Sequence, residues 1–516
     1  MLSKSNILSY LQCARKLWLE QHEPELASPE GASTRRRKND GNLVGGRARD
    51  QLGEDLLRPP VRDDQTVAAE EAKSLLLRHP GSPAAEVPMA HGGLYARTDA
   101  LIPEGGGYVL QETKASSFPL KSDKVTPGKP KEHHLDDLAI QAWVMSQSGI
   151  PMQRAELNLL NNRWRYPGGG DYSGLFRQLD ATADMRDRVD QVPGWLDGVQ
   201  SAIKGDKPEV RMAKQCHSPY ECPFQNHCRT LEPPGPDHPI ELLPDAAGKL
   251  LARKLREKKG YLSILDPSPE ELTGSQKDLY RRIQEAHRSG QAVIVPGSAK
   301  IIERFPYPRY YFDFEGIDLP VPVWPGVRPY EQIPFQWSCH IERAPGVFEH
   351  AEFLDLTGGD PSLPCIQRME EIIDQDDDGP IFVYFAAYEK TRLRELSERH
   401  SRYADLVEKY LNRVVDLLPL VKQHFYHPHM CGSFSMKKVL PAIAPDLDYG
   451  ALDGVQEGTA AQIAYLEAAL NEYTPEEDKA RLEQELRRYC RQDTWALVEI
   501  AHFLAQRGRP SRPPGM

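Results

Sequence analysis

Tyr310-Tyr-Phe-Asp-Phe-Glu315 is the stretch that decides the fold of the C-terminal half, because its aromatic residues predict a buried strand. Nearer the C-terminus, Tyr489-Cys-Arg-Gln-Asp493 has the spacing of one helical face. Alternate residues of a strand share a face, so Asp313 and Glu315 point the same way. Carboxylates that converge repel one another and are stable together when divalent cations bind them. The two segments therefore predict a carboxylate pocket, whose usual chemistry is two-metal phosphodiester hydrolysis.

The composition of the whole chain sets its broad class. At 516 residues it is too long for one ordinary core, so two domains and a connecting region are expected. The net charge of −11 argues against coating nucleic acid through bulk charge, but it is compatible with a nuclease whose carboxylates bind metal. The mean hydropathy is −0.57, no apolar run could span a membrane, and the N-terminus lacks a signal-peptide core. We expect a cytoplasmic protein with no membrane partner.

The chain divides at Pro233-Pro-Gly-Pro236, a strong turn signal. Residues 1–232 predict a first α/β domain, and residues 233–305 predict a helical connector without a strand. Residues 306–507 predict a second α/β domain, and the Pro- and Arg-rich residues 508–516 predict a disordered tail.

Within these domains, hydrophobic periodicity predicts the main elements. In the first domain we expect a helix over 3–22, a flexible loop over 27–42 and a hairpin formed by 93–102 and 108–114. A second helix over 135–148 and a further strand over 155–160 follow. The second is expected to hold strands at 310–315, 335–340, 348–355 and 381–384.

More pieces of the C-terminal site follow the acidic strand in order. Ile381-Phe-Val-Tyr reads as a buried strand that leads to Glu389. Gly432-Ser-Phe-Ser-Met-Lys-Lys-Val-Leu440 resembles the serine–lysine turn that precedes a helix in polymerase proofreading domains. Taken alone, Asp313 and Glu315 are also compatible with the solvent face of an exposed strand. The ordered set of acidic and turn segments favours a metal site instead.

This order resembles the DEDD exonucleases, the proofreading and RNase D-like branch of the RNase H-like fold. The Tyr-x-x-x-Asp ending is similar to their tyrosine subclass, which implies that Tyr489 positions the attacking water. The resemblance also implies that two divalent ions, Mg²⁺ or Mn²⁺, are bound by Asp313, Glu315, Glu389 and Asp493. The chain departs from the family at Glu389, where Asp is usual, and Asp416 remains an alternative ligand.

A second group of charged residues lies in the N-terminal hairpin. Asp99 is expected on one strand, and Glu112 and Lys114 share a face of the next. Two carboxylates can bind a metal ion, while a lysine beside them can stabilise the transition state or assist the water. The alternative is an ordinary surface hairpin with a cross-strand ion pair.

The hairpin and the helix after it resemble the RecB-type PD-(D/E)xK nucleases, which have a restriction-endonuclease-like fold. Asp137-Leu-Ala-Ile-Gln141 resembles their glutamine motif, so the resemblance implies catalytic roles for Asp99, Glu112, Lys114 and Gln141, with Asp99 and Glu112 as metal ligands. Where the family often has an upstream histidine or glutamate, this chain offers Asp50 and Glu54. Met145 replaces a frequent tyrosine, which keeps an inactive or repurposed site open as an interpretation.

Four cysteines form a third candidate site. Cys216, Cys222 and Cys228 are separated by two five-residue gaps, which are atypical of zinc knuckles, and Cys13 is the candidate fourth ligand. This arrangement resembles RecB-like nucleases with a 4Fe–4S cluster, which implies a structural cluster at Cys13, Cys216, Cys222 and Cys228. Zinc at the same residues, with His217 or His227, and four unrelated thiols are the alternatives.

The full combination resembles a bacterial family in which a RecB-like nuclease domain is fused to a C-terminal domain of unknown function. It implies a metal-dependent nuclease that acts on DNA rather than RNA, with a 3′–5′ exonuclease site and a second, RecB-like site. One alternative is an exonuclease whose N-terminal domain only binds nucleic acid. Another is a non-catalytic metal-cluster scaffold in a repair or defence complex.

Overall fold

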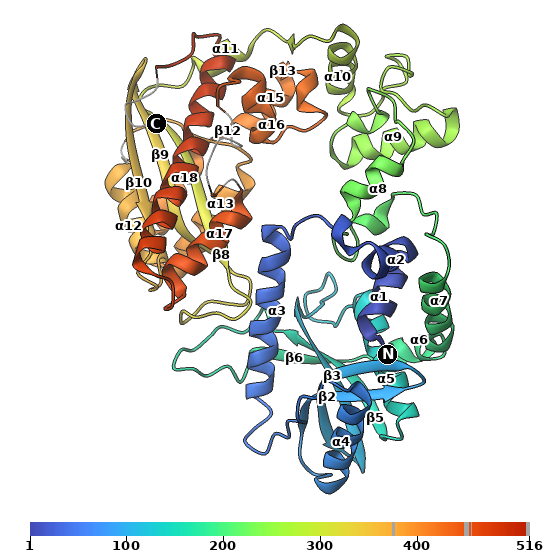
Figure 1. The fold of residues 1–516 in the computed structure, drawn as a ribbon. Helices are drawn as coiled ribbons and strands as arrows, with labels where there is room; N and C mark the ends of the chain where they lie inside the picture. The colour runs from blue at the N-terminus through green and yellow to red at the C-terminus, as the bar shows by residue number, and fades with distance from the viewer. Residues whose placement is uncertain (374–376, 448–453, 456, 512–516) are drawn as a thin grey trace. The chain divides into compact units, whose positions relative to one another are not determined.

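The computed structural model describes residues 1–373, 377–447, 454–455 and 457–511, and the chain is mixed α/β (Figure 1). It separates into two compact units. Unit 1 contains Met1–Pro233 together with Asp318–Glu331, and unit 2 contains Pro234–Ile317 and the residues from Gln332 onward. None of the helices in the described ranges is long and apolar enough to cross a membrane.

Unit 1 is built on a six-stranded sheet with the order β1-β3-β4-β5-β6, in which β2 pairs with β3. The strands are β1 (Leu2–Ser3), β2 (Ala84–His91), β3 (Leu94–Glu104), β4 (Gly107–Ser117), β5 (Met152–Leu160) and β6 (Phe176–Asp180). The predicted hairpin is β3–β4, which is antiparallel and turns at Gly105 and Gly106, both at positive φ. Strand β5 is parallel to β4, and the segment between them contains α5 (Glu132–Gln147).

Helix α5 is buried on most of its surface, including its polar residues His134, Asp137 and Gln141, and it packs into the core of unit 1. The other main helices of this unit are α1 (Lys4–Gln12), α2 (Ala14–His22), α3 (Ala32–Asp50), α4 (Gln65–Arg78), α6 (Thr182–Val189), α7 (Val192–Lys204) and α8 (Gln225–Leu231). The N-terminal helix predicted over 3–22 is divided at Cys13, whose extended backbone separates α1 from α2.

The flexible loop predicted over 27–42 is wrong, because most of it forms the first part of α3. The sequence of this segment has no apolar stripe that would mark a helix. One of the side chains that the helix buries is charged: Arg36 is 6% exposed. The Arg36 guanidinium is held by the carboxylate of Asp40 and by Asp318, which returns to unit 1 from far along the chain. A contact of this kind cannot be read from local periodicity.

Unit 2 is built on a five-stranded sheet with the order β10-β9-β8-β11-β12. Its strands are β8 (Arg309–Asp318), β9 (Gln332–Ala344), β10 (Val347–Leu354), β11 (Ile381–Val383) and β12 (Val414–Asp416). Strands β9 and β10 are antiparallel, whereas β11 is parallel to both β8 and β12. All four strands predicted in this part of the sequence are therefore present.

The helices of this sheet region are α12 (Ser362–Ile372), α13 (Ala387–Arg399), α14 (Ala404–Arg413), α15 (Leu417–His424), α16 (Met436–Ile443), α17 (Gly458–Tyr465) and α18 (Glu476–Leu504). The longest is α18, which packs against β9 (Figure 1). Thr494 of α18 makes hydrogen bonds with Ser338 and His340 of β9, and Gln336 donates to the carbonyl of Leu486. These buried polar contacts fix the rotation of α18 on the sheet.

Residues 233–305 hold the helices α9 (Asp245–Lys259), α10 (Lys277–Ser289) and α11 (Ser298–Ile302). They also contain a short strand that the sequence did not indicate, β7 (Val293–Ile294), paired with β13 (Phe425–Tyr426). In the predicted tail, residues 508–511 form no helix or strand, although Arg509 is paired with Glu499, and residues 512–516 lie outside the described part of the chain.

Candidate functional site

Three carboxylates converge in unit 2, on the strand and the helix that the sequence pointed to. Asp313 and Glu315 come from β8, and Asp493 comes from α18. One oxygen from each lies within 4.8 Å of the other two. Among the residues that the structure describes, no other three Asp, Glu, His or Cys side chains bring their ligand atoms this close together. An exposed strand face, the alternative for Asp313 and Glu315, is wrong because neither residue is exposed and both line a cavity with Asp493.

The alternation of β8 explains why the two carboxylates point together. Tyr310, Phe312 and Phe314 are buried in the core of the unit, so the residues between them face the opposite side of the sheet. On that side, the thiol of Cys490 lies against the carbonyl of Asp313. A one-residue shift of β8 would exchange the aromatic and acidic faces.

Glu389 is a fourth acid near this group: it does not line the cavity, but its charge repels that of Asp313. It lies in the first turn of α13, is 3% exposed, and has one carboxylate oxygen, Oε2, without a hydrogen-bond partner in the described structure. Asp416, the alternative, accepts hydrogen bonds at 3.0 Å from the backbone N–H groups of Phe385, Ala386 and Leu418. Its carboxylate caps α15 and holds the turn before α13, whereas Glu389 has a free oxygen for a ligand.

Burial and mutual repulsion alter the acidity of the pocket. Burial, followed by repulsion from Asp493, Glu315 and Glu389, raises the pKa of Asp313 well above its ordinary value. Burial, followed by repulsion from Asp493, raises the pKa of Glu315 to about 8. Burial likewise raises the pKa of Glu389 to about 8. Without a cation, protons reduce the repulsion in this pocket at neutral pH, and a divalent cation would replace them.

The pocket has a volume of about 420 Å³, and its non-acidic wall includes Tyr489, Lys437, Ser435 and Tyr388. The ammonium of Lys437 lies 5.4 Å from the ring centroid of Tyr489 and acts to lower the pKa of Glu315. Ser435 ends the predicted turn in extended conformation, directly before α16. Ser435 at the end of the turn and Lys437 in the first turn of α16 therefore bring a hydroxyl and a cation to the same pocket as the tyrosine.

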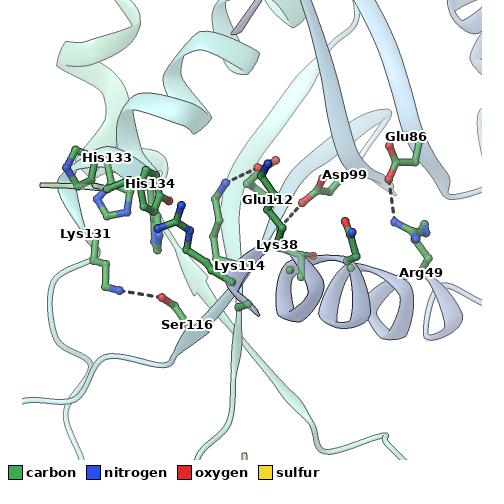
Figure 2. Close-up of a pocket in the computed structure, with 18 residues that line it drawn as sticks. Lys38, Arg49, Glu86, Asp99, Glu112, Lys114, Ser116, Lys131, His133 and His134 are labelled. Atoms are coloured by element: carbon green, nitrogen blue, oxygen red, sulfur yellow. Dashed lines mark hydrogen bonds and ion pairs between the residues drawn. The ribbon is translucent and has the colours of Figure 1, made fainter. Parts of the chain in front are cut away.

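The hairpin of unit 1 forms a second charged site, shown in Figure 2. The Lys114 ammonium lies 2.7 Å from Glu112 (Figure 2). Gln141 donates to the other oxygen of Glu112 at 2.8 Å. Asp99 accepts a hydrogen bond of 2.8 Å from the backbone N–H of Thr113. Glu112 is only 3% exposed, so the alternative of an ordinary surface hairpin is wrong. Asp99, Glu112, Thr113 and Lys114 line a cleft of about 660 Å³, which we call the hairpin cleft.

Sequence reasoning missed Lys4, which completes this group. Its ammonium lies 2.7 Å from Asp137 and 3.4 Å from Glu112, while Lys114 lies 2.5 Å from the other oxygen of Asp137. The start of α1 is fixed by the capping box of Ser3, which sets the direction of Lys4. No local signal marks this lysine, because its partners are more than a hundred residues away in the chain.

Burial and neighbouring charges shift the pKa of several members of this group. Burial, with repulsion from Glu112, raises the pKa of Asp99 to about 7. Burial acts to lower the pKa of Lys114, but Asp137, Glu112 and Asp99 together raise it above its ordinary value. Lys114 is therefore a fixed cation, and Asp99 is the carboxylate of the group that a metal ion would most readily deprotonate.

Neither upstream candidate reaches the hairpin cleft. Asp50 is exposed and pairs with Arg47, and Glu54 is exposed beyond the end of α3. The positions of α3 that line the cleft are Arg37, Lys38, Gly41, Asn42, Gly45 and Arg49. Among the residues described, this helix thus contributes no carboxylate or imidazole to the cleft. Met145 is fully buried in the core of unit 1 and plays a packing role.

The four predicted cysteines line one small cavity, which also includes Arg15, Lys16 and Phe224. Burial raises the pKa of Cys222 to about 11 in the absence of a metal, with Cys13 and Cys228 among its neighbours. The alternative of four unrelated thiols does not fit this convergence. His217 is exposed and pairs with Glu221, whereas His227 has a buried Nε2 without a partner in the described structure.

The separation of these sulfur atoms bears on the choice of metal. In a tetrahedral zinc site with Zn–S bonds of about 2.3 Å, the sulfur atoms are roughly 3.8 Å apart. No three of the four thiols lie within 4.8 Å of one another, and all four belong to the described residues. The spacing is wider than a single zinc ion requires.

A comparison with protein families gives one match, to a domain of unknown function (DUF2779), over residues 310–435. The match runs from β8 to the turn before α16, so it includes Asp313, Glu315 and Glu389 but ends before Tyr489 and Asp493. No curated protein matches the chain.

Proposed function

We propose that this protein is a metal-dependent nuclease whose unit 2 pocket removes nucleotides from the 3′ end of a DNA strand. The observation that carries the proposal is the convergence of Asp313, Glu315 and Asp493, with the buried Glu389 beside them. Four acidic side chains, three of them (Asp313, Glu315 and Glu389) with a raised pKa, are costly to bury together unless cations bind them. Oxygen donors of this kind suit Mg²⁺ or Mn²⁺.

The fold supports this assignment. The sheet order β10-β9-β8-β11-β12, with an antiparallel β9–β10 pair and parallel β8, β11 and β12, is the order expected of an RNase H-like domain. In that arrangement the first strand lies at the centre of the sheet and carries the first acidic residues. Here β8 is central and carries Asp313 and Glu315.

The chemistry follows from the side chains around the pocket. Divalent cations held by Asp313, Glu315, Glu389 and Asp493 would supply an activated water and stabilise the leaving 3′ oxygen. Tyr489, which lines the pocket, would orient the water through its hydroxyl, and the cation–π contact with Lys437 restrains its ring. Lys437 also adds positive charge where the phosphate would enter.

The hairpin cleft is proposed as a second nuclease centre of the PD-(D/E)xK type. Asp99 and Glu112 would hold a cation, Gln141 orients Glu112, and Lys114 supplies a fixed positive charge. The order of helix, hairpin, helix and parallel strand in unit 1 is compatible with a restriction-endonuclease-like core. The cation of Lys4 beside Asp137 is this chain's own addition to the group.

We propose a 4Fe–4S cluster at Cys13, Cys216, Cys222 and Cys228. The donor set is four thiols that line one small cavity, no three of them within 4.8 Å of one another, and thiolates are the ligands that hold such clusters. The residues therefore fit the group. A cluster there would join α1–α2 to the segment after α7 and so hold the two ends of unit 1 together.

Variants that inactivate one centre at a time test the proposal. The full-length protein, Asp493→Asn and Glu112→Gln would be incubated with end-labelled single-stranded and duplex DNA, and with RNA, in Mg²⁺ or Mn²⁺. We expect Asp493→Asn to abolish release of mononucleotides from the 3′ end, and Glu112→Gln to abolish a second cleavage pattern. If Glu112→Gln changes nothing, the hairpin cleft only binds nucleic acid. If the unaltered protein cleaves no substrate with either metal, the scaffold alternative stands.

A further inference from the structure

The segment that carries three of the cysteines also forms a wall of the hairpin cleft. Tyr220 lies between Cys216 and Cys222, and it lines the cleft together with Asp99, Glu112 and Lys114. It is 39% exposed, although large apolar and aromatic side chains are usually covered. An open aromatic ring in a charged cleft requires an explanation other than core packing.

The position of Tyr220 is fixed by the backbone of its own loop. The Gln12 amide donates to the carbonyl of Tyr220 at 2.6 Å and to that of Gln215 at 2.9 Å. The N–H of Cys222 donates to the carbonyl of Cys216 at 2.8 Å, which closes the loop. Tyr220 therefore stands on a constrained loop and not on a freely moving one.

Planar and cationic groups surround the ring. The guanidinium of Arg37 lies over it at 4.5 Å from the centroid, and His133 meets it edge-on at 5.4 Å. Burial, followed by the charge of Lys131, lowers the pKa of His133 to about 4, so this imidazole is neutral at pH 7. Figure 2 shows His133 and His134 beside Lys131, on the opposite side of the view from the Arg49–Glu86 pair.

The charges of this wall suit a polyanion. Arg37, Lys38 and Lys131 are exposed and line the cleft. Lys38 is 63% exposed in its side chain and has only a surface pair with Glu30, while Lys131 donates to the hydroxyl of Ser116. These cations are therefore available to phosphate groups at little cost.

We propose that Tyr220 is a nucleobase-stacking residue and that the hairpin cleft takes a single strand. A base within a duplex is already stacked and cannot offer its face, whereas an unpaired base can lie on an aromatic ring while cations follow its backbone. Arg37 and Lys38 would hold the phosphates on either side of the stacked base. The inference rests on the proposed nuclease function of the cleft for its substrate, but Tyr220 can be tested through binding alone.

The test compares an oligothymidylate with an otherwise identical strand that carries abasic sites. Affinity would be measured by fluorescence anisotropy without divalent cations, so that no cleavage occurs. Stacking of one base is worth about 1–3 kcal/mol, so the full-length protein should prefer the base-bearing strand by roughly 5- to 100-fold. Tyr220→Ala should reduce that preference severalfold, whereas Tyr220→Phe should retain it. Tyr473→Ala is the control, since Tyr473 is 93% exposed and does not line the cleft.

Photocrosslinking identifies the site of binding. An oligonucleotide with 4-thiothymidine should crosslink to the peptide that contains Tyr220, and unlabelled single strand should compete better than duplex. The proposal is overturned if Tyr220→Ala leaves the base preference unchanged, if Tyr220→Phe loses it, or if duplex competes as well as single strand. A stacking result in a protein that cleaves nothing would keep the binding role and reject the nuclease centre.

Discussion

Lys4 and Lys114, which are more than a hundred residues apart in the chain, hold the two oxygens of one carboxylate, Asp137. The first contact is 2.7 Å long and the second is 2.5 Å. Asp137 is 4% exposed, so its charge is compensated by these cations rather than by water. The pair of lysines therefore holds α1 and β4 against α5 and sets the charge beside Glu112.

Lys4→Met should destabilise unit 1, because it leaves Asp137 buried with one cation fewer. We expect a loss of roughly 3 kcal/mol in the free energy of unfolding, measured by urea denaturation. Lys38→Met is the matched control: its partner is Glu30 and its side chain is 63% exposed, so its loss should stay below about 1 kcal/mol. Equal losses from the two variants would show that the Lys4 pair is no more than a surface ion pair.

Stability of the metal-free protein should fall as the pH rises through the acidic pocket's range. The pKa of Glu315 is raised from 4.5 to about 8, so the folded state holds a proton that the unfolded state has lost. The stability that this extra proton gives the folded state is complete below pH 4.5 and is lost as the pH rises through about 8. The free energy of unfolding should fall by roughly 2 kcal/mol or more over this range.

Thermal unfolding at pH 5 and pH 8, with and without Mn²⁺, measures this effect. Mn²⁺ should raise the melting temperature more at pH 8, where the carboxylates are free to bind it. The double variant Asp313→Asn/Glu315→Gln should reduce both the pH dependence and the Mn²⁺ effect. An unchanged pH profile in the double variant would assign the effect to other groups.

Glu389 and Asp416 should respond to substitution in opposite ways. Glu389→Gln replaces a buried carboxyl group whose ionisation burial disfavours, so activity should be lost while the metal-free protein becomes no less stable. Asp416→Ala removes a carboxylate that accepts three backbone hydrogen bonds, so it should destabilise the protein by about 1–2 kcal/mol. Isothermal titration with Mn²⁺ and chemical denaturation separate the two effects; if Asp416→Ala alone abolished Mn²⁺ binding, Asp416 would be the ligand.

Phe385 has a strained backbone, with φ of 68°, although it is 58% exposed. Phe385→Gly and Phe385→Ala both remove the ring, but only glycine adopts this conformation without strain. The glycine variant should therefore be more stable than the alanine variant by about 1 kcal/mol in chemical denaturation. The reverse order would show that the Asp416 cap tolerates a side chain here without strain.

Loss of one cysteine ligand should remove the cofactor. Protein purified without oxygen should show broad absorption in the violet and blue, and Cys13→Ser should lose most of the iron and the colour. Cys431→Ser is the control, since Cys431 is an exposed thiol that does not line the cysteine cavity. A colourless protein that contains one zinc ion per chain would instead support the zinc alternative.

The sequence by itself determined the local elements that carry the chemistry. The alternation of β8 separates Phe312 and Phe314 from Asp313 and Glu315, and the helical spacing of α18 aligns Tyr489 with Asp493. Those outcomes depend on short-range periodicity, which is present in the residues themselves. The hairpin of Asp99 and Glu112 was predictable for the same reason, with glycines at its turn.

Only the tertiary structure decided which distant groups share a site. Lys4 beside Asp137, Tyr220 in the hairpin cleft and Arg36 buried against Asp318 join segments that no local pattern relates. In the folded chain Asp416 caps α15, whereas one carboxylate oxygen of Glu389 has no hydrogen-bond partner in the described structure. Such partners depend on how the chain packs, because burial makes an unpaired charge costly and so fixes which charges meet.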